Sequence, residues 1–401
     1  MRRIESGPGH VLLVRHGEGR GRMPRYNLRF LRYARRQRPD LWARLRLHFT
    51  GEPPPCLDGV RAVVFWVGDP LREMYPEEYR ECAAVAVRAR QCGIPLVNPP
   101  ESLSNTRKGT MGRIWRDAGL PTPGCWSFGD RRSFEGAVRQ LAFPAVVRGE
   151  SCHAQEGLRM FADREEALAC PDEELPYPGV LSGFVDTREG WRRRDPQALP
   201  ARYFHKKRVL VYGDRVVCRN WYLSPEPIVG HPKQSLFGPG FQRPGPAGRL
   251  FGPCPLVREA VELERRWIEL GPEDADLFRT AVRVLGLGFA ALDYATPGPG
   301  RIVLWEANPY PYLPPPDQAT LSGPRRLEAE ERRHHEAMAA WLSELAGMEA
   351  AEAGRPSGGP PGSARRARLA LRPDSRNPRG IPARGARHHG MSTTMQEIEI
   401  K

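Results

Sequence analysis

Three oxygen-bearing side chains are spaced along residues 286–313 so that two strands would bring them together. Asp293 follows the apolar run FAAL, and Glu306 and Asn308 follow the apolar run IVLW. Alternation along an extended strand places Glu306 and Asn308 on one face. If the two runs form adjacent strands, all three residues lie at neighbouring strand ends. Carboxylate and amide oxygens suit Mg²⁺, which takes one or two carboxylates with phosphate oxygens and water. We predict that these residues are metal ligands.

Lysine is rare in this chain, which makes its few lysines informative. Only five of the 61 basic residues are lysines. A lysine is a compact point charge that suits phosphate. Lys108 opens a segment with helical spacing, and Lys206, Lys207 and Arg208 lie in an apolar segment that we predict to be a strand. Alternation would place Lys206 and Arg208 on one face and Lys207 on the other.

The first hundred residues alternate between apolar strands and helical patterns, which predicts a parallel α/β sheet. The expected strands are residues 10–15, 62–67 and 94–97, and the expected helices are a basic amphipathic pair over 26–48 and a helix over 77–92.

A different order follows, with fewer helices between the strands. The helices expected there are 108–118, 163–170, 273–285 and 325–345, and the strands are 125–128, 144–147, 179–185, 203–212, 215–222, 289–294 and 301–306. Gly213-Asp214 is a hairpin signal between two of these strands. Residues 224–255 are rich in Gly and Pro and predict an extended loop, and residues 354–390 have the composition of a disordered tail. We therefore predict domains at 1–104, 105–348 and 349–401.

Charge and cysteine usage exclude several classes of protein. The net charge of +14 resides at the ends of the chain, with +10 in residues 1–50 and +6 in residues 350–401, which leaves −2 between them. A nearly neutral body argues against a nucleic-acid groove. The eight cysteines form no CxxC pair, and no run of 18 apolar residues exists. We expect a soluble cytoplasmic protein without a membrane partner, and we leave a homo-oligomer open.

From about Gly93 to Pro311 the sequence resembles the ATP-grasp superfamily, which includes glutathione synthetase, D-alanine–D-alanine ligase and the peptide and protein glutamate ligases. The segment GIPLVNPPESLSNTRKGTMGRIWRDAGLPTPG is similar to the entry into that fold, and there Lys108 matches a lysine that contacts ATP phosphates. FPAVVRGESCHAQEGLRMF is similar to a strand, covering loop and strand in which a second lysine contacts phosphate. Arg148 stands in the place of that lysine.

Two further segments carry the resemblance. GVLSGFVD, residues 179–186, looks like the hinge strand between two lobes, near residues 180–187, whose backbone pairs with the adenine edge. The family's usual acid is replaced there by Gly183. The residues that the resemblance assigns to the nucleotide are Ser182, Phe184 and Val185, with Asp186 or Glu189 for the ribose. FHKKRVLVYGDRVVCRNWY resembles the hairpin that carries a basic catalytic residue, here Lys207 or Arg208.

The resemblance implies an ATP-grasp fold with an N-terminal Rossmann-like pre-ATP-grasp domain, two lobes and a dispensable tail. It implies a ligase that uses Mg²⁺ and ATP to convert a carboxylate into an acyl phosphate, which an amine then attacks to form a C–N bond. The carboxylate and amine, small molecules or a peptide, are not identified by the sequence, because acceptor residues of the superfamily lie on variable loops.

Two alternatives stay open. Arg148 and Gly183 depart from the family pattern and allow a nucleotide-binding regulator without ligase activity. Arg15-His16-Gly17, after an apolar strand, resembles the signature of histidine phosphatases, but the later His389-Gly390 falls in the predicted tail.

Overall fold

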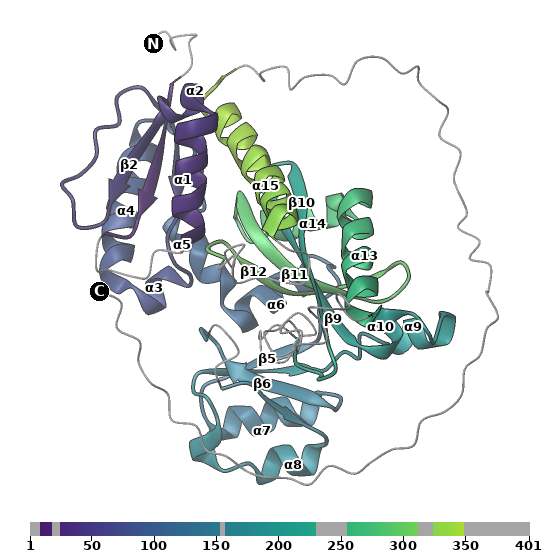
Figure 1. The fold of residues 1–401 in the computed structure, drawn as a ribbon. Coiled ribbons are helices and arrows are strands. Elements are labelled where there is room, and N and C mark those ends of the chain that lie inside the picture. Colours follow the sequence, from purple (N-terminus) through teal and green to yellow (C-terminus); the bar gives the residue numbers. More distant parts are fainter. Residues whose placement is uncertain (1–8, 18–24, 153–156, 230–254, 312–323, 349–401) are drawn as a thin grey trace, which may run out of the picture. The chain divides into compact units, whose positions relative to one another are not determined.

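The computed structural model describes residues 9–17, 25–152, 157–229, 255–311 and 324–348. The described residues belong to one compact unit (Figure 1). The predicted tail, His389-Gly390 and most of the predicted loop at 224–255 lie outside the described residues. Each cysteine in the described ranges is a free thiol. No helix in those ranges has both the length and the apolar character needed to cross a membrane.

The N-terminal sheet is parallel, with strand order β2-β1-β3-β4. Its strands are β1 (His10–Arg15), β2 (Leu45–Phe49), β3 (Val60–Phe65) and β4 (Leu96–Val97). Its helices are α1 (Arg25–Gln37), α2 (Pro39–Trp42), α3 (Leu71–Met74) and α4 (Pro76–Gln91). The parallel sheet is as predicted. The helix pair expected over 26–48 is wrong at its end, because residues 45–48 belong to β2. That strand pairs with β1 and needs extended backbone.

A smaller antiparallel sheet follows, with strand order β5-β8-β6-β7. Its strands are β5 (Cys125–Phe128), β6 (Ala145–Gly149), β7 (Arg159–Phe161) and β8 (Gly179–Gly183). Helices α7 (Arg131–Gln140) and α8 (Arg164–Ala169) lie on the same side of it in Figure 1, and Phe134 and Ala167 share its core. Helix α7 was not predicted. The Asp130 side chain accepts from Ser133 N–H and the Ser133 hydroxyl accepts from Asp130 N–H, which makes a capping box.

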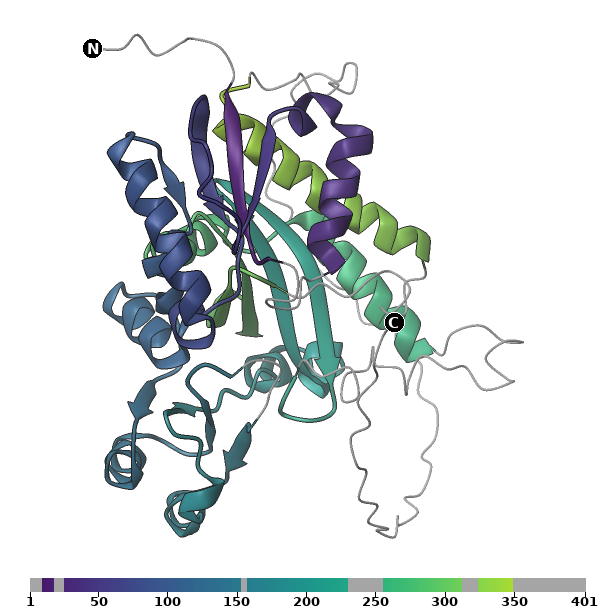
Figure 2. The same cartoon turned by 90° about the vertical axis from the view of Figure 1, so that its left-hand side faces the viewer.

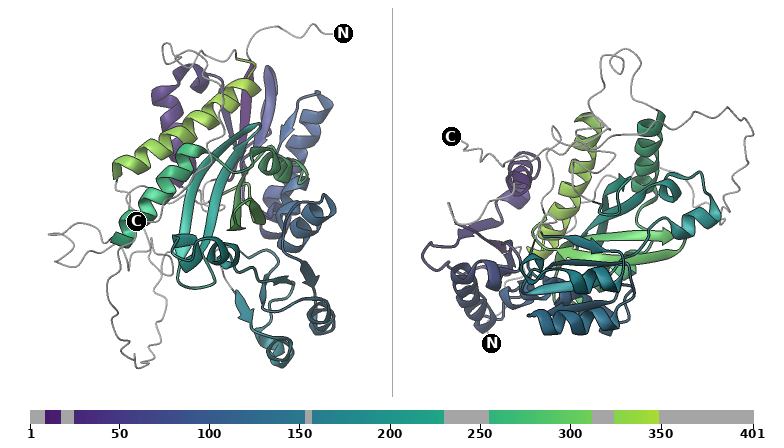
Figure 3. Two further views of the ribbon diagram at one scale, coloured as in Figure 1. Left: turned by 90° about the vertical axis from the view of Figure 1, so that its right-hand side faces the viewer. Right: turned by 90° about the horizontal axis from the view of Figure 1, so that it is seen from below.

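The third sheet is also antiparallel, with strand order β10-β9-β11-β12. Its strands are β9 (Phe204–Tyr212), β10 (Arg215–Ser224), β11 (Phe289–Gly298) and β12 (Arg301–Asn308). Helices α13 (Pro255–Leu270), α14 (Ala275–Arg283) and α15 (Pro324–Leu345) pack against it (Figures 2 and 3). The expected hairpin is present, and Gly213 has the positive φ of +56° that its turn requires. Helix α13 was not predicted.

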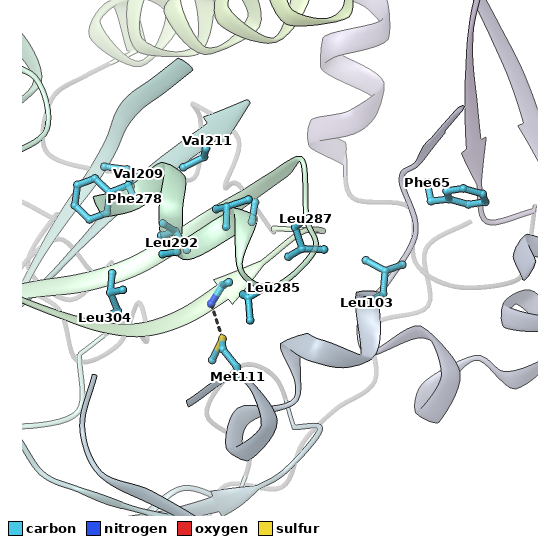
Figure 4. Close-up of a cluster of buried hydrophobic side chains, with 14 of the residues drawn as sticks. Phe65, Leu103, Met111, Val209, Val211, Phe278, Leu285, Leu287, Leu292 and Leu304 are labelled. Carbon is cyan, nitrogen blue, oxygen red and sulfur yellow. Dashed lines mark hydrogen bonds between the residues drawn. The ribbon is translucent and has the colours of Figure 1, made fainter. Parts of the chain in front are cut away.

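Helix α6 (Lys108–Asp117) is anchored to the third sheet, which fixes the position of Lys108. Figure 4 shows Met111 beneath the strands, where its sulfur accepts the Ala307 N–H at 3.1 Å. The Trp115 indole N–H donates to the Ala281 carbonyl at 2.9 Å. The remaining short elements are α5 (Pro100–Leu103), α9 (Glu189–Arg194), α10 (Leu199–Arg202) and the 3-10 turns Ser104–Thr106 and Asp172–Glu174.

Candidate active site

Asp293 and Glu306 lie side by side on neighbouring strands of the third sheet. They are direct partners in the register of β11 and β12, so their side chains lie on the same face. The sequence prediction placed Asp293 at a strand end, but β11 continues to Gly298 and Asp293 lies inside it. The two strands are antiparallel, so their carboxyl ends lie at opposite edges. The register, rather than shared strand ends, brings the carboxylates together.

Two cations from outside the third sheet contact Glu306. Lys108, at the start of α6, places Nζ 2.6 Å from Oε1. Arg148, on β6 of the smaller sheet, places Nη1 3.5 Å from Oε2. Burial alone would raise the pKa of Glu306, but the charges of Lys108 and Arg148 outweigh it and hold the pKa well below its usual range. Glu306 is therefore an ionised carboxylate that joins the two sheets.

Two further cations contact Asp293 from the neighbouring strand β9. Arg208 is the register partner of Asp293 and binds both carboxylate oxygens, with Nε at 2.6 Å and Nη2 at 2.9 Å. Lys206 Nζ lies 2.9 Å from Oδ2. Burial would raise the pKa of Asp293, and the charges of Arg208 and Lys206 lower it overall. Lys206 was not selected from the sequence as a site residue, although alternation already placed it on the face of Arg208.

Lys207 lies on the opposite face of β9. It is 3% exposed, pairs with Glu273, and holds Nζ 3.9 Å from the centre of the Trp221 ring. The Tyr294 hydroxyl donates to the same Glu273 carboxylate at 2.5 Å. Burial lowers the pKa of Lys207 and the Glu273 charge opposes this. Of the two alternatives for the basic catalytic residue, the structure brings Arg208 to the carboxylates and places Lys207 in the core behind them.

Asn308, the third predicted metal ligand, is half-buried at the end of β12. Its register partner is Ala291, and its side-chain oxygen accepts the Tyr310 N–H at 3.0 Å. Asn308 thus lies two residues after Glu306 on the same strand, and its hydrogen bond from Tyr310 fixes the backbone just after β12.

The residues assigned to the nucleotide lie at the end of β8 and just after it. The Ser182 hydroxyl donates to the Val146 carbonyl at 3.4 Å, and Phe184 N–H donates to the Pro144 carbonyl at 2.9 Å. Val185 is half-buried. These contacts run between β8 and β6, the strand that carries Arg148.

Both candidate ribose acids already have arginine partners. Asp186 accepts from Arg188 Nε at 2.9 Å and from Arg188 Nη2 at 2.9 Å. Burial raises the pKa of Asp186, but the hydrogen bonds from Arg188 lower it by more. The pKa of Asp186 is therefore below its usual value. Glu189 is exposed and pairs with Arg193.

Glu150 is a buried acid that the sequence analysis did not single out. It follows β6, is 2% exposed, and accepts the Gly109 N–H at 3.2 Å at the start of α6. Lys108 N–H donates to its carbonyl at 3.2 Å. Glu150 therefore ties the end of β6 to the start of α6 and keeps Arg148 and Lys108 together. An acid in a loop gives no sequence signal of such burial.

His16, the candidate phosphatase nucleophile, is 2% exposed. Its Nε2 accepts the Gly68 N–H at 2.7 Å, and its ring lies 4.7 Å from the Tyr75 ring. Burial lowers its pKa. A nucleophilic histidine needs an accessible ring nitrogen with a free lone pair, so this geometry does not favour a phosphatase.

The order of the three sheets determines where the site residues meet. A parallel N-terminal sheet is followed by two antiparallel sheets, and Lys108 and Arg148 converge on Glu306 beside Asp293. This arrangement agrees with the fold that the sequence resemblance to the ATP-grasp superfamily implies. No protein-family model matches its sequence, and no curated protein matches it either.

Several solved structures of ATP-grasp proteins are similar to this chain. One is the ATP-grasp ligase PsnB complexed with a phosphomimetic variant of a minimal precursor, Mg and ADP, with 16% identity, a TM-score of 0.46 and coverage of 84% of this chain and 98% of that chain. Another is D-alanine–D-alanine ligase from Bacillus anthracis complexed with ATP, with 13% identity, a TM-score of 0.46 and coverage of 84% and 97%. A third is a RimK domain ATP-grasp protein from Sphaerobacter thermophilus, with 14% identity, a TM-score of 0.42 and coverage of 82% and 99%.

Proposed function

We propose that this chain is an ATP-grasp carboxylate–amine ligase that binds Mg-ATP between its two antiparallel sheets. The observation that carries the proposal is the meeting of four cations with two carboxylates on one sheet face. Lys108 and Arg148 contact Glu306, and Lys206 and Arg208 contact Asp293. Four positive charges against two negative ones favour a polyanion, and ATP carries the phosphates that such a site would neutralise.

The residues present fit a magnesium ion. Mg²⁺ takes one or two carboxylates and completes its shell with phosphate oxygens and water. Asp293 and Glu306 are cross-strand neighbours, and both pKa values are lowered, so both are ionised. No group of three His, Cys, Asp or Glu side chains suited to a metal occurs in the described ranges, and the ligand set proposed here consists of two carboxylates and the Asn308 amide. We assign Asp293, Glu306 and Asn308 as the residues that would hold Mg²⁺, which would neutralise phosphate charge there.

The cations would then exchange partners when the nucleotide binds. Lys108 and Arg148 each hold Glu306 by a single charged contact. Phosphate oxygens can replace a carboxylate oxygen at these groups, because both are oxyanions that accept charged hydrogen bonds. We assign Lys108 and Arg148 to the phosphates, and Arg208 to the phosphoryl group that is transferred. The hinge residues Ser182, Phe184 and Val185 would bind adenine, and Asp186 or Glu189 would bind the ribose.

The proposed reaction has two steps. A carboxylate oxygen attacks the γ-phosphorus, the bond to the β,γ-bridging oxygen breaks, and ADP leaves. The amine nitrogen then attacks the acyl carbon, loses a proton, and inorganic phosphate leaves with the former carboxylate oxygen. Arg208 and Lys206 lie beside Asp293 and would stabilise the negative charge on the acyl phosphate and on the tetrahedral intermediate.

The test is ADP release from Mg-ATP with panels of carboxylic acids, alone and with amines. Hydroxylamine serves as a general amine that converts an acyl phosphate into a hydroxamate, which forms a coloured complex with added ferric ion. The proposal requires a carboxylate-dependent hydroxamate that is lost in Arg208→Met and kept in Lys207→Met when folded protein is compared. ATP hydrolysis that is indifferent to every acid and amine would contradict it.

A further inference from the structure

A cavity of about 190 Å³ lies at the edge of the third sheet, and none of the residues that line it belongs to the proposed active site. Its walls are residues 216–218 of β10, Ile268, Gly271 and Pro272 at and just after the end of α13, and Arg333 of α15. Both helices pack against β10, which is the outermost strand of its sheet (Figure 1). Successive residues of a strand point to opposite faces, so three consecutive lining residues place the cavity at the strand edge.

The side chains that line the cavity are apolar apart from Arg333. Cys218 is among them, because burial raises the pKa of its thiol to about 12 and keeps it neutral. Leu270 lies in sequence between the lining residues Ile268 and Gly271. At 87% exposed, it is the most exposed large apolar side chain in the described ranges. An apolar cavity beside such a leucine suits the hydrocarbon part of a ligand.

The volume of the cavity limits what it can hold. An apolar cavity of about 150 Å³ binds benzene, whereas pockets for drug-sized ligands enclose about 300–1,000 Å³. A cavity of about 190 Å³ therefore has room for one aromatic ring or for a branched aliphatic group of that size.

Arg333 gives the cavity one positive charge. Its side chain is exposed and has no ion pair or hydrogen bond with the described part of the chain. Three charged side chains act electrostatically on Cys218, and they are Glu273, Lys207 and Arg333. Lys207 and Glu273 form an ion pair and offset each other, so the charge of Arg333 is left unmatched. A planar guanidinium can bind both oxygens of a carboxylate.

We propose that this cavity binds a small apolar monocarboxylate. The hydrocarbon part fills the space between β10 and the end of α13, and the carboxylate pairs with Arg333. A single unmatched cation balances a monoanion, whereas a phosphate dianion would leave charge uncompensated beside an apolar wall. The inference goes beyond the proposed ligase function and does not rest on it, because the cavity shares no residue with the proposed active site.

A ligand-detected NMR titration of the full chain with phenylacetate, without ATP or Mg²⁺, tests the site. Phenylacetate supplies one ring and one carboxylate, acetate keeps the charge without the ring, and phenylacetamide keeps the ring without the charge. We expect saturable binding of phenylacetate and no detectable binding of acetate. Phenylacetamide should bind about 2- to 5-fold more weakly than phenylacetate, because a pair with an exposed arginine is screened by solvent.

Four variants locate the probe. Arg333→Met should weaken phenylacetate by the same factor and leave phenylacetamide unchanged. Arg332→Met, at the neighbouring exposed arginine of α15, is the matched control and should change neither affinity. Val216→Phe fills the cavity from a half-buried position and should abolish binding of both ring compounds. Arg208→Met should keep the binding, because Arg208 belongs to the proposed active site.

Absent binding of phenylacetate to the wild type, or unchanged binding to folded Val216→Phe, would overturn the site. Equal losses for acid and amide in Arg333→Met, or no loss for either, would overturn the assignment of the carboxylate. Loss of binding in Arg208→Met would place the probe in the proposed active site and overturn the inference. Should Val216→Phe fail to fold, the exposed position of Arg333 keeps the test available. No nucleotide takes part, so failure here leaves the hydroxamate test of the ligase proposal unaffected.

Discussion

Asp293 and Glu306 are direct cross-strand partners, yet each is held by cations from a different part of the chain. Arg208 and Lys206 reach Asp293 from the neighbouring strand β9, and Lys108 and Arg148 reach Glu306 from α6 and β6. The first set belongs to the third sheet itself. Lys108 and Arg148 reach Glu306 only because α6 and the smaller sheet pack against the third sheet. The side chains that we assign to the nucleotide phosphates are therefore the same ones that join the smaller sheet to the third sheet.

Arg148 should contribute to ATP affinity through its charge. We expect Arg148→Ala to weaken binding by roughly 10- to 100-fold, since a hydrogen bond to a charged group contributes about 1.5–3 kcal/mol. Arg148→Lys, which installs the family's usual residue, should retain most of the affinity. Calorimetric titration with ATP and Mg²⁺ measures both. Equal affinities for wild type and Arg148→Ala would remove Arg148 from the phosphate site.

The pair of Lys207 and Glu273 should matter for stability and not for nucleotide binding. Lys207→Met removes the cation beside Glu273, whose side chain is 31% exposed and still accepts from the Tyr294 hydroxyl, so the cost should stay below the about 3–5 kcal/mol of a fully buried pair. The double variant with Glu273→Gln should recover part of that loss. Urea unfolding gives the free energies, and ATP titration of the folded protein should be unchanged. A loss of ATP binding in folded Lys207→Met would reinstate Lys207 as a site residue.

Acid should destabilise the chain through the site carboxylates. The pKa values of Glu306 and Asp293 are lower in the folded protein than their ordinary values of about 4.3 and 3.9. A lowered folded-state pKa means that the stabilisation is present above the unfolded-state pKa and is lost as the pH falls toward the folded-state pKa. The unfolding free energy should therefore fall below about pH 4.5, with a shallower fall in Glu306→Gln. An unchanged slope would show that the cations contribute nothing to folding at this position.

Gly109 should resist substitution because Ser127 and Glu150 lie against it. An added Cβ would lie 1.8 Å from Ser127 Oγ and 3.0 Å from a Glu150 oxygen, so Gly109→Ala should cost about 1–3 kcal/mol. Gly136→Ala is the control within α7, where nothing lies within 4 Å of the added atom, and it should stabilise by about 0.5–1 kcal/mol. Denaturant unfolding compares them. Equal effects of the two substitutions would mean that Ser127 and Glu150 do not crowd the start of α6.

Sequence reasoning predicted the parts of this fold whose pattern is local. Alternation separated Lys207 from Lys206 and Arg208, and Gly213-Asp214 indicated the hairpin that the structure contains. The segment 45–48 was misread because its leucines continue a helical spacing, whereas pairing with β1 determines its conformation.

The rest of the site depends on long-range pairing that no local pattern contains. Asp293 meets Glu306 through the register of two antiparallel strands, not through shared strand ends. Glu150 is buried because α6 closes over it, 41 residues away in sequence from Gly109. Arg15 and His16 could be read only as the polar end of a strand, because their burial depends on β3 and Tyr310.

Calorimetric titration of ATP with and without Mg²⁺, on the wild type and on Glu306→Gln, tests the central claim most directly. The variant keeps the size of the side chain and removes the charge that would hold the metal. We expect Mg-dependent binding of ATP to the wild type and loss of the Mg-dependent part in Glu306→Gln, with unchanged folding by circular dichroism. Binding that is absent, or that is indifferent both to Mg²⁺ and to Glu306, would contradict the assignment of this sheet face as a Mg-ATP site.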